Sequence, residues 1–311
     1  MATLAAPAAK RNRRAVVRFA WIVLGFFILV VLWGAVVRST GSGGGCGSNW
    51  PLCNGDFVPH HPRLATVIEF THRSTSGICT FLLVALGVWT FAVTERGHRA
   101  RTAVLWSAFL LVTEAILGAV LVLRHYVENT YSVGRVVTQS IHFTNTMLFM
   151  GALALTAWFL SDDSEIVKEI QAHRWVGLLA VIATLVVGAT GSLAALADTL
   201  FPSPTLQAGL MADFVAGSPI LVRMRWIHPA AAVVGFVCVL LLARTGSATA
   251  KLVIALLAMQ FVLGIADVLL LAPTWMQVVH LLGADLYWVA LTVLAAGAIW
   301  PAQKASTRVA G

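Results

Sequence analysis

The stretch VVRFAWIVLGFFILVVLWGAVV, residues 16–37, has a single charged side chain in 22 positions. A helix that crosses a membrane needs about 20 predominantly apolar residues, so this stretch predicts a transmembrane helix. It lacks a small-residue cleavage site, which favours a retained helix over a removed signal peptide. Comparable apolar runs occupy residues 66–93, 102–123, 135–160, 175–197, 224–243, 251–271 and 274–299. We therefore expect eight membrane spans.

The composition of the whole chain agrees with a polytopic membrane protein. Of its 311 residues, 59% are hydrophobic and 11% are charged, whereas an average soluble domain has about 25% charged residues. So few charges cannot cover a water-exposed surface, which excludes a soluble enzyme and a disordered chain. The net charge of +8 is typical of basic loops that orient transmembrane helices. No basic stripe with interleaved aromatic residues indicates nucleic acid as a partner.

The distribution of Lys and Arg predicts that both ends of the chain lie in the cytoplasm. With the N-terminus inside, 14 of the 21 basic residues fall in cytoplasmic segments and 7 on the outer side, as the positive-inside rule requires. The expected segments are a cytoplasmic tail (1–15), an N-terminal half (16–160) with a long outer loop (38–65), a cytoplasmic linker (161–174), a C-terminal half (175–299) and a cytoplasmic tail (300–311).

The two halves resemble each other, which indicates an internal duplication. Similar motifs recur in the same order. They are GAVVRSTGS (34–42) and GATGS (188–192), ILGA (116–119) and VLGI (262–265), and QSIH (139–142) and QVVH (277–280). We therefore expect an all-α membrane protein of eight transmembrane helices, arranged as two pseudo-repeated four-helix bundles.

Four of the nine histidines lie inside apolar runs, one on each even-numbered helix: His72, His142, His228 and His280. At 1.5 Å per residue, each lies about 6–11 Å below the outer start of its helix. Ionisable groups in a membrane are costly and usually functional. Two neutral imidazoles from facing helices suit the axial positions of haem iron. The pattern predicts one haem between the first two histidines and another between the last two. Zinc, which takes three or four grouped ligands, fits less well.

Glu69 and a cysteine pair distinguish the first half from the second. Glu69 precedes the first membrane histidine by one helical turn and is a candidate proton acceptor or charge stabiliser. The alternative is that it pairs with Arg73. Its counterpart in the second half is Arg225, so the two sites are chemically unequal. Cys46 and Cys53 lie in a Gly-rich outer loop, which favours a disulfide; that disulfide is either a staple or redox-active.

Other charged residues near the membrane have less specific roles. Several arginines at outer helix ends are candidate contacts for haem propionates, with lipid-phosphate anchoring as the alternative. These are Arg38, Arg73, Arg135 and Arg225. Three further acidic residues are expected within the membrane, in interhelical hydrogen bonds or a proton path, and none is assigned a catalytic role. These are Glu114, Asp267 and Asp285.

The motifs of the first half resemble those of the haem A synthase family. They are GAVVRSTGSG (34–43), Cys46, WPLCNG (50–55) and EFTHR (69–73). The Gln-x-x-His motifs and IHP (227–229) agree with the same family. The resemblance extends over residues 16–299, and a cysteine loop followed by Glu-x-x-His is a specific combination. Some members carry a second cysteine pair in the third outer loop, but residues 198–223 contain no cysteine, so a relay through two pairs is not expected.

This resemblance implies a multi-pass enzyme of the bacterial cell membrane, embedded in lipid. The family oxidises a pyrrole methyl group of haem O to the formyl group of haem A for terminal oxidase assembly, with water as the expected oxygen source. The implied partners are the haem O synthase that supplies the substrate and an electron acceptor that the sequence does not identify. Whether the chain forms a homo-oligomer is left open.

The resemblance also implies roles for individual residues. His228 and His280 would ligate a resident haem B, and His72 and His142 would surround the iron of the substrate haem O or product haem A. Glu69 would take part in the chemistry. Cys46 and Cys53 would have a disulfide or redox role.

Two other classes of protein remain alternatives. A transmembrane di-haem electron carrier of the b type, linked to quinol, explains the four histidines but gives no role to Glu69 or the cysteine loop. A transporter built from two parallel repeats, with histidines as proton relays, predicts no bound chromophore. The identity of the co-purifying haems distinguishes the three.

Overall fold

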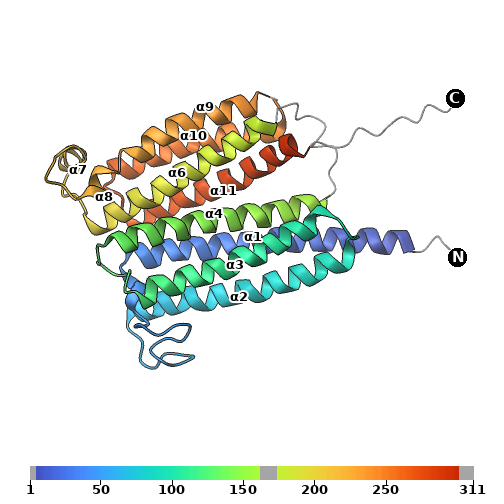
Figure 1. The fold of residues 1–311 in the computed structure, drawn as a ribbon, viewed down its shortest axis with the longest axis horizontal. Coiled ribbons are helices and arrows are strands. Elements are labelled where there is room, and N and C mark those ends of the chain that lie inside the picture. The colour runs from blue at the N-terminus through green and yellow to red at the C-terminus, as the bar shows by residue number, and fades with distance from the viewer. Residues whose placement is uncertain (1–4, 162–173, 245, 301–311) are drawn as a thin grey trace.

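The protein is a bundle of long helices, described here from a computed structural model (Figure 1). The structure describes residues 5–161, 174–244 and 246–300, where every regular element is a helix. The long helices are α1 (Ala5–Ser39), α2 (Leu64–Val93), α3 (Arg99–Leu123), α4 (Val133–Ser161), α6 (Arg174–Leu200), α9 (Ile227–Ala243), α10 (Ala248–Leu269) and α11 (Thr274–Ile299). Nearly all of the expected linker (161–174) and C-terminal tail (300–311) lies outside the described residues.

The expectation of eight membrane spans is confirmed. Within the described residues, eight helices are long and apolar enough to cross a membrane, so the chain is a multi-pass membrane protein. Most bounds agree with the sequence prediction to within a few residues. The exception is α1, which begins at Ala5 rather than at residue 16. The segment AAKRNRRA (8–15) contains good helix formers and no Gly or Pro, so the helix extends beyond its apolar stretch.

The segment between α6 and α9 is partly helical, which the sequence did not predict. It contains α7 (Leu206–Ala212) and α8 (Ile220–Arg223). The Thr205 hydroxyl caps α7 by accepting a hydrogen bond from the amide of Ala208 at 3.2 Å. The shorter α8 directly precedes α9, so the sixth span runs from Ile220 to Ala243 with an irregular segment in it.

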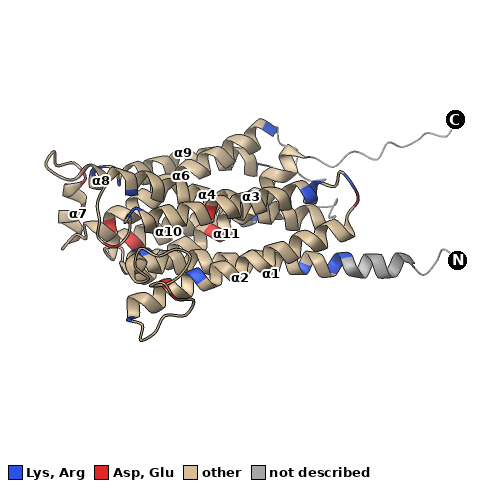
Figure 2. Cartoon of the chain, turned by 60° about the horizontal axis from the view of Figure 1, so that its bottom comes forward, with Lys and Arg blue, Asp and Glu red and all other residues tan. Residues whose placement is uncertain are grey.

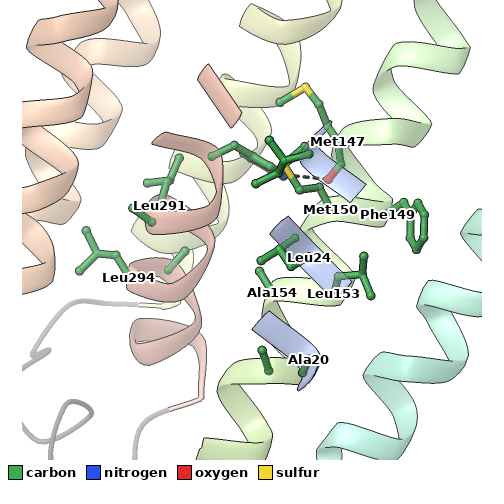
Figure 3. Packing of buried hydrophobic residues seen from close by; sticks show 14 of the residues in the cluster. Ala20, Leu24, Met147, Phe149, Met150, Leu153, Ala154, Leu291 and Leu294 are labelled. Atoms are coloured by element: carbon green, nitrogen blue, oxygen red, sulfur yellow. Dashed lines mark hydrogen bonds between the residues drawn. The ribbon is translucent and has the colours of Figure 1, made fainter. Parts of the chain in front are cut away.

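The long helices form two groups that meet along α1 and α4 on one side and α6 and α11 on the other (Figure 1). Small residues such as Ala20 of α1 and Ala154 of α4 lie fully buried in the hydrophobic core and allow close helix approach. Figure 3 shows Leu24, Leu153 and Leu291 packed in the same cluster.

A polar contact also crosses this boundary. The indole N–H of Trp288 on α11 donates to the Met147 carbonyl on α4 at 2.7 Å. Both atoms are buried, so the bond fixes the depth of α11 relative to α4.

Charge is concentrated towards the two ends of the bundle, with a few acidic residues near its middle (Figure 2). The N-terminal end of α1 and the C-terminal end of α11 lie at the same end of the bundle (Figure 1). The opposite end carries α7, α8 and the cysteine segment (Figure 1). The outward faces of the helices are apolar, for example at Phe81 and Val262, as contact with lipid requires.

Candidate functional site

The structure brings His228 of α9 and His280 of α11 together. Their ring centroids are 6.5 Å apart and their planes cross at 82°. A bond from a metal to an imidazole nitrogen is about 2 Å long and the centroid lies about 1 Å further on, so two axial imidazoles have centroids about 6 Å apart. The pair therefore fits opposite sides of one iron atom. This confirms that the two side chains lie close to each other; their role as haem ligands stays a prediction.

His228 is oriented by the helix next to it. Its Nδ1 lies 3.0 Å from the Val187 carbonyl oxygen on α6. A carbonyl can only accept, so Nδ1 carries the hydrogen and Nε2 has its lone pair free for a metal. The Nδ1 atom of His280 is buried without a hydrogen-bond partner in the described part of the chain.

Glycines provide the space for three of the four histidine rings. A Cβ atom at Gly34 would lie 3.0 Å from Cε1 of His72, and one at Gly191 would lie 2.9 Å from Cε1 of His228. A Cβ atom at Gly264 would lie 3.3 Å from Cε1 of His280. Only glycine allows a ring to lie this close to a neighbouring helix. The sequence identifies these glycines as members of the repeated motifs, but it does not indicate that they lie against the histidine rings.

His142 has different surroundings. A Cβ atom at Gly118, the counterpart of Gly264, would meet nothing within 4 Å. Instead, Nδ1 of His142 lies 3.4 Å from Oε2 of Glu114 on α3. Asn145 and Thr146, one turn further along α4, hydrogen-bond the same carboxylate. Glu114 thus makes the interhelical hydrogen bonds that its position in the membrane predicts.

Glu69 is paired with Arg73, the alternative that the sequence left open. Oε1 of Glu69 accepts from Nη2 and Nε of Arg73 at 2.5 and 3.1 Å. Oε2 accepts the backbone N–H of Cys46 at 2.7 Å. Arg73 also donates through Nη1 to the carbonyls of Asn49 and Leu52, both at 2.6 Å. Glu69, with 3% of its surface exposed, therefore anchors the cysteine loop to α2.

The predicted disulfide between Cys46 and Cys53 is present. Both cysteines are buried, and the amide of Asn54 donates to the Cys46 carbonyl at 2.9 Å. The two further cysteines, Cys79 and Cys238, are free thiols. The disulfide loop thus lies on the turn of α2 that carries Glu69, one turn before the first membrane histidine.

Arg38 joins the two halves. At the end of α1, its Nη1 donates to the Ala195 carbonyl and the Thr199 hydroxyl of α6 at 2.7 and 2.5 Å. Its Nη2 donates to Oε1 of Gln277 on α11 at 2.6 Å. Gln277 also donates to the Ala272 carbonyl at 2.6 Å. One guanidinium therefore fixes α1 to α6 and α11 of the other half.

The other predicted propionate contacts are also bonded to the protein. Arg135, with 2% exposure, donates to three carbonyls of the loop before α4. Arg225 forms ion pairs with Asp198 and Asp213 at 2.8 and 2.6 Å. Arg73 is held by Glu69, as described above. The expected propionate contacts stay a prediction.

Two membrane acids have incomplete hydrogen bonding. Oδ1 of Asp267 and Oδ2 of Asp285 are buried and have no hydrogen-bond partner among the described residues. Asp285 lies in the interior of α11, with 4% of its surface exposed. No interhelical hydrogen bond involving these two oxygens is found in the part of the chain that the structure describes.

The fold and these side chains define a multi-pass helical membrane protein with two histidine-based candidate haem sites. A family model described as cytochrome oxidase assembly protein (COX15-CtaA) matches residues 17–292. The chain therefore belongs to this family, that of the haem A synthases.

Known relatives are similar over different lengths. A protein from Thermus thermophilus named protoheme IX farnesyltransferase is 40% identical over 293 residues, 90% of this chain and 48% of that protein. A haem A synthase from Exiguobacterium is 34% identical over 177 residues, 55% of this chain and 54% of that protein. One from Bacillus cereus is 41% identical over 92 residues, 30% of each chain. The chain spans about half the length, or less, of these curated relatives.

Proposed function

We propose that the chain is a haem A synthase, which converts a pyrrole methyl group of haem O into the formyl group of haem A. Family membership and the names of two relatives support this activity. The observation that carries it is the facing pair His228 and His280, with ring centroids 6.5 Å apart. Such a pair suits a six-coordinate haem that transfers electrons rather than a zinc ion.

The second half is the proposed site of haem B. His228 and His280 would hold it, and when bound it supplies one-electron transfer. The Val187 carbonyl fixes the His228 tautomer, and Gly191 and Gly264 allow both rings to lie against their neighbouring helices. Preorganised rings lose little freedom when they bind a ligand.

The first half is the proposed substrate site, with His72 and His142 around the iron of haem O. Oxidation of a methyl to a formyl group with water as the oxygen donor releases electrons and protons, so the site needs a proton acceptor. Glu69 is the proposed acceptor. Its neighbour Arg73 and the Cys46 amide hold the carboxylate in place.

The proposed orientation places the disulfide loop outside and both ends of the chain in the cytoplasm. Disulfides persist on the oxidising side of a cell membrane, and the excess of basic residues in the other loops agrees. The ends of α1 and α11 on one side of the bundle (Figure 1) fit an even number of spans. The motifs shared by the two halves, 16–160 and 175–299, support an internal duplication.

Haem O synthase is the proposed source of the substrate. The Thermus thermophilus relative carries the name of a protoheme IX farnesyltransferase, and 48% of its length matches this chain. Because nearly half of a protein with that name is similar to this chain, the similarity supports farnesyl transfer as the reaction that supplies the substrate proposed here.

Identification of the haems that co-purify with the full chain tests the proposed function. We expect haem B together with haem O or haem A, resolved by extraction and chromatography. Haem B alone in both halves would instead identify the di-haem electron carrier. A colourless protein would favour the transporter.

The role of Glu69 requires a matched pair of variants, because this residue also anchors the loop. Glu69→Gln removes the carboxylate, whereas Arg73→Gln breaks the same ion pair and keeps the carboxylate. We expect Glu69→Gln to lower haem A formation steeply at unchanged haem O binding, and Arg73→Gln to lower it less. Equal losses in both variants would assign the effect to loop anchoring, and full activity of Glu69→Gln would remove it from the mechanism.

A further inference from the structure

Glu114 is a membrane carboxylate that the function proposed above does not use. Its Oε2 lies 3.4 Å from Nδ1 of His142, just beyond a well-formed hydrogen bond. That Nδ1 is buried and has no hydrogen-bond partner among the described residues. A histidine that ligates a metal through Nε2 usually donates its Nδ1–H to a carboxylate, a carbonyl or water. Glu114 is the group placed to accept it.

The surrounding polar residues hold Glu114 towards α4. Asn145 donates from Nδ2 to Oε2 of Glu114 at 2.6 Å, and the Thr146 hydroxyl donates to Oε1. Asn145 is itself fixed, because it donates to the Leu110 carbonyl at 2.9 Å and accepts from the Thr113 hydroxyl at 2.7 Å. A carboxylate has about four acceptor sites, so Oε2 can accept a further N–H from the histidine.

The second half lacks this carboxylate. In the register given by the ILGA and VLGI motifs, Glu114 corresponds to Gln260. In the register given by the QSIH and QVVH motifs, Asn145 corresponds to Gly283. The Nε2 atom of Gln260 lies against Gly283, three residues after His280, so the amide occupies the place where the first half has an acid. An amide is uncharged, so it increases electron donation by a neighbouring imidazole less than a carboxylate does.

We propose that Glu114 is a positioning residue of the first half: it accepts the Nδ1–H of His142, fixes the ring with Nε2 free, and makes this imidazole a stronger electron donor than His280. A stronger donor stabilises oxidised iron, so a haem in the first half is easier to oxidise than one in the second. This inference rests on the proposed function, because it assumes that His142 ligates the substrate haem.

The test is a spectroscopic redox titration of the purified full chain with haem O in the first half and haem B in the second. The variants His142→Ala and His280→Ala identify which absorbance change belongs to which half. At the wild-type midpoint potential of the first half, we expect Glu114→Gln to raise the ratio of reduced to oxidised haem about tenfold. Thr113→Val, which alters the same network but keeps the carboxylate, should change it less than about twofold.

Gln260→Glu is the reciprocal variant, and it does not depend on correct folding of Glu114→Gln. It should lower the ratio of reduced to oxidised haem in the second half by a similar factor. An unchanged ratio in either correctly folded variant would overturn the inference and leave the haem-site assignment intact. If His142→Ala leaves the first-half spectrum unchanged, the ligand assignment in the proposed function is wrong, and the role of Glu114 fails with it.

Discussion

Gly191→Ala should weaken haem binding in the second half, although it adds only one methyl group. The new Cβ atom would lie 2.9 Å from Cε1 and 3.1 Å from Nδ1 of His228, whereas carbon atoms in contact prefer about 3.5–4.0 Å. The ring must therefore move by roughly 0.5–1 Å. That movement also takes Nδ1 away from the Val187 carbonyl, which accepts its hydrogen bond at 3.0 Å.

The size of the effect follows from this crowding. Forcing a methyl group into a packed site costs about 1–3 kcal/mol. Since about 1.4 kcal/mol corresponds to a tenfold change in affinity, the haem dissociation constant should rise about 10- to 100-fold. Replacing Gly by Ala inside a helix such as α6 otherwise stabilises it by about 1 kcal/mol. Loss of haem from this variant would therefore not result from a less stable helix, because the substitution by itself makes α6 more stable.

Gly118→Ala is the matched control. Gly118 also lies inside a long helix, but a Cβ atom there meets nothing within 4 Å. Haem content per protein and the visible spectrum should change in Gly191→Ala and stay as in the wild type in Gly118→Ala. Unaltered haem content and spectrum in Gly191→Ala would refute the conclusion that glycine makes room for the His228 ring.

Three further variants test other parts of the structure. His280→Ala should lose the haem of the second half while the first half still binds haem, as measured by haem extraction; full retention would contradict the ligand assignment. Arg38→Met removes the three hydrogen bonds between the halves and should lower the free energy of unfolding by about 2–4 kcal/mol, measured by thermal unfolding in detergent. An unchanged unfolding temperature would show that the bonds contribute nothing. Cys53→Ser should open the outer loop to proteolysis and expose the Cys46 thiol to alkylation without loss of the helical bundle; a loop that stays resistant would show that Glu69 and its partners hold it unaided.

The membrane spans could be predicted from the sequence because lipid imposes one rule on every span. Each must satisfy its own backbone hydrogen bonds and present apolar side chains, and runs such as 274–299 coincide with a helix. The short helix α7 was missed because it is only seven residues long, too short for an apolar periodicity to distinguish it from a loop.

Contacts between helices were harder to predict. A helix that is apolar all round gives little indication of which face points to a neighbour. The pairing of His228 with His280 was foreseen because both lie in the second half, one on each of its even-numbered helices. The closeness of Glu114 to His142 was not, because it depends on the rotation of α3 about its axis. The partners of Arg38 lie 157 to 239 residues away, and no local pattern indicates them.

The bonds of Arg38 have a consequence for biosynthesis. Arg38 belongs to α1, which the ribosome delivers to the membrane before α6 and α11, but its acceptors are Ala195, Thr199 and Gln277. The last of them is synthesised only when α11 begins. Until α6 and then α11 are inserted, the guanidinium lacks these partners. Nascent chains that stop before α11 would have the two acceptors on α6 but would lack Gln277, so the guanidinium would turn that donor to water or lipid headgroups.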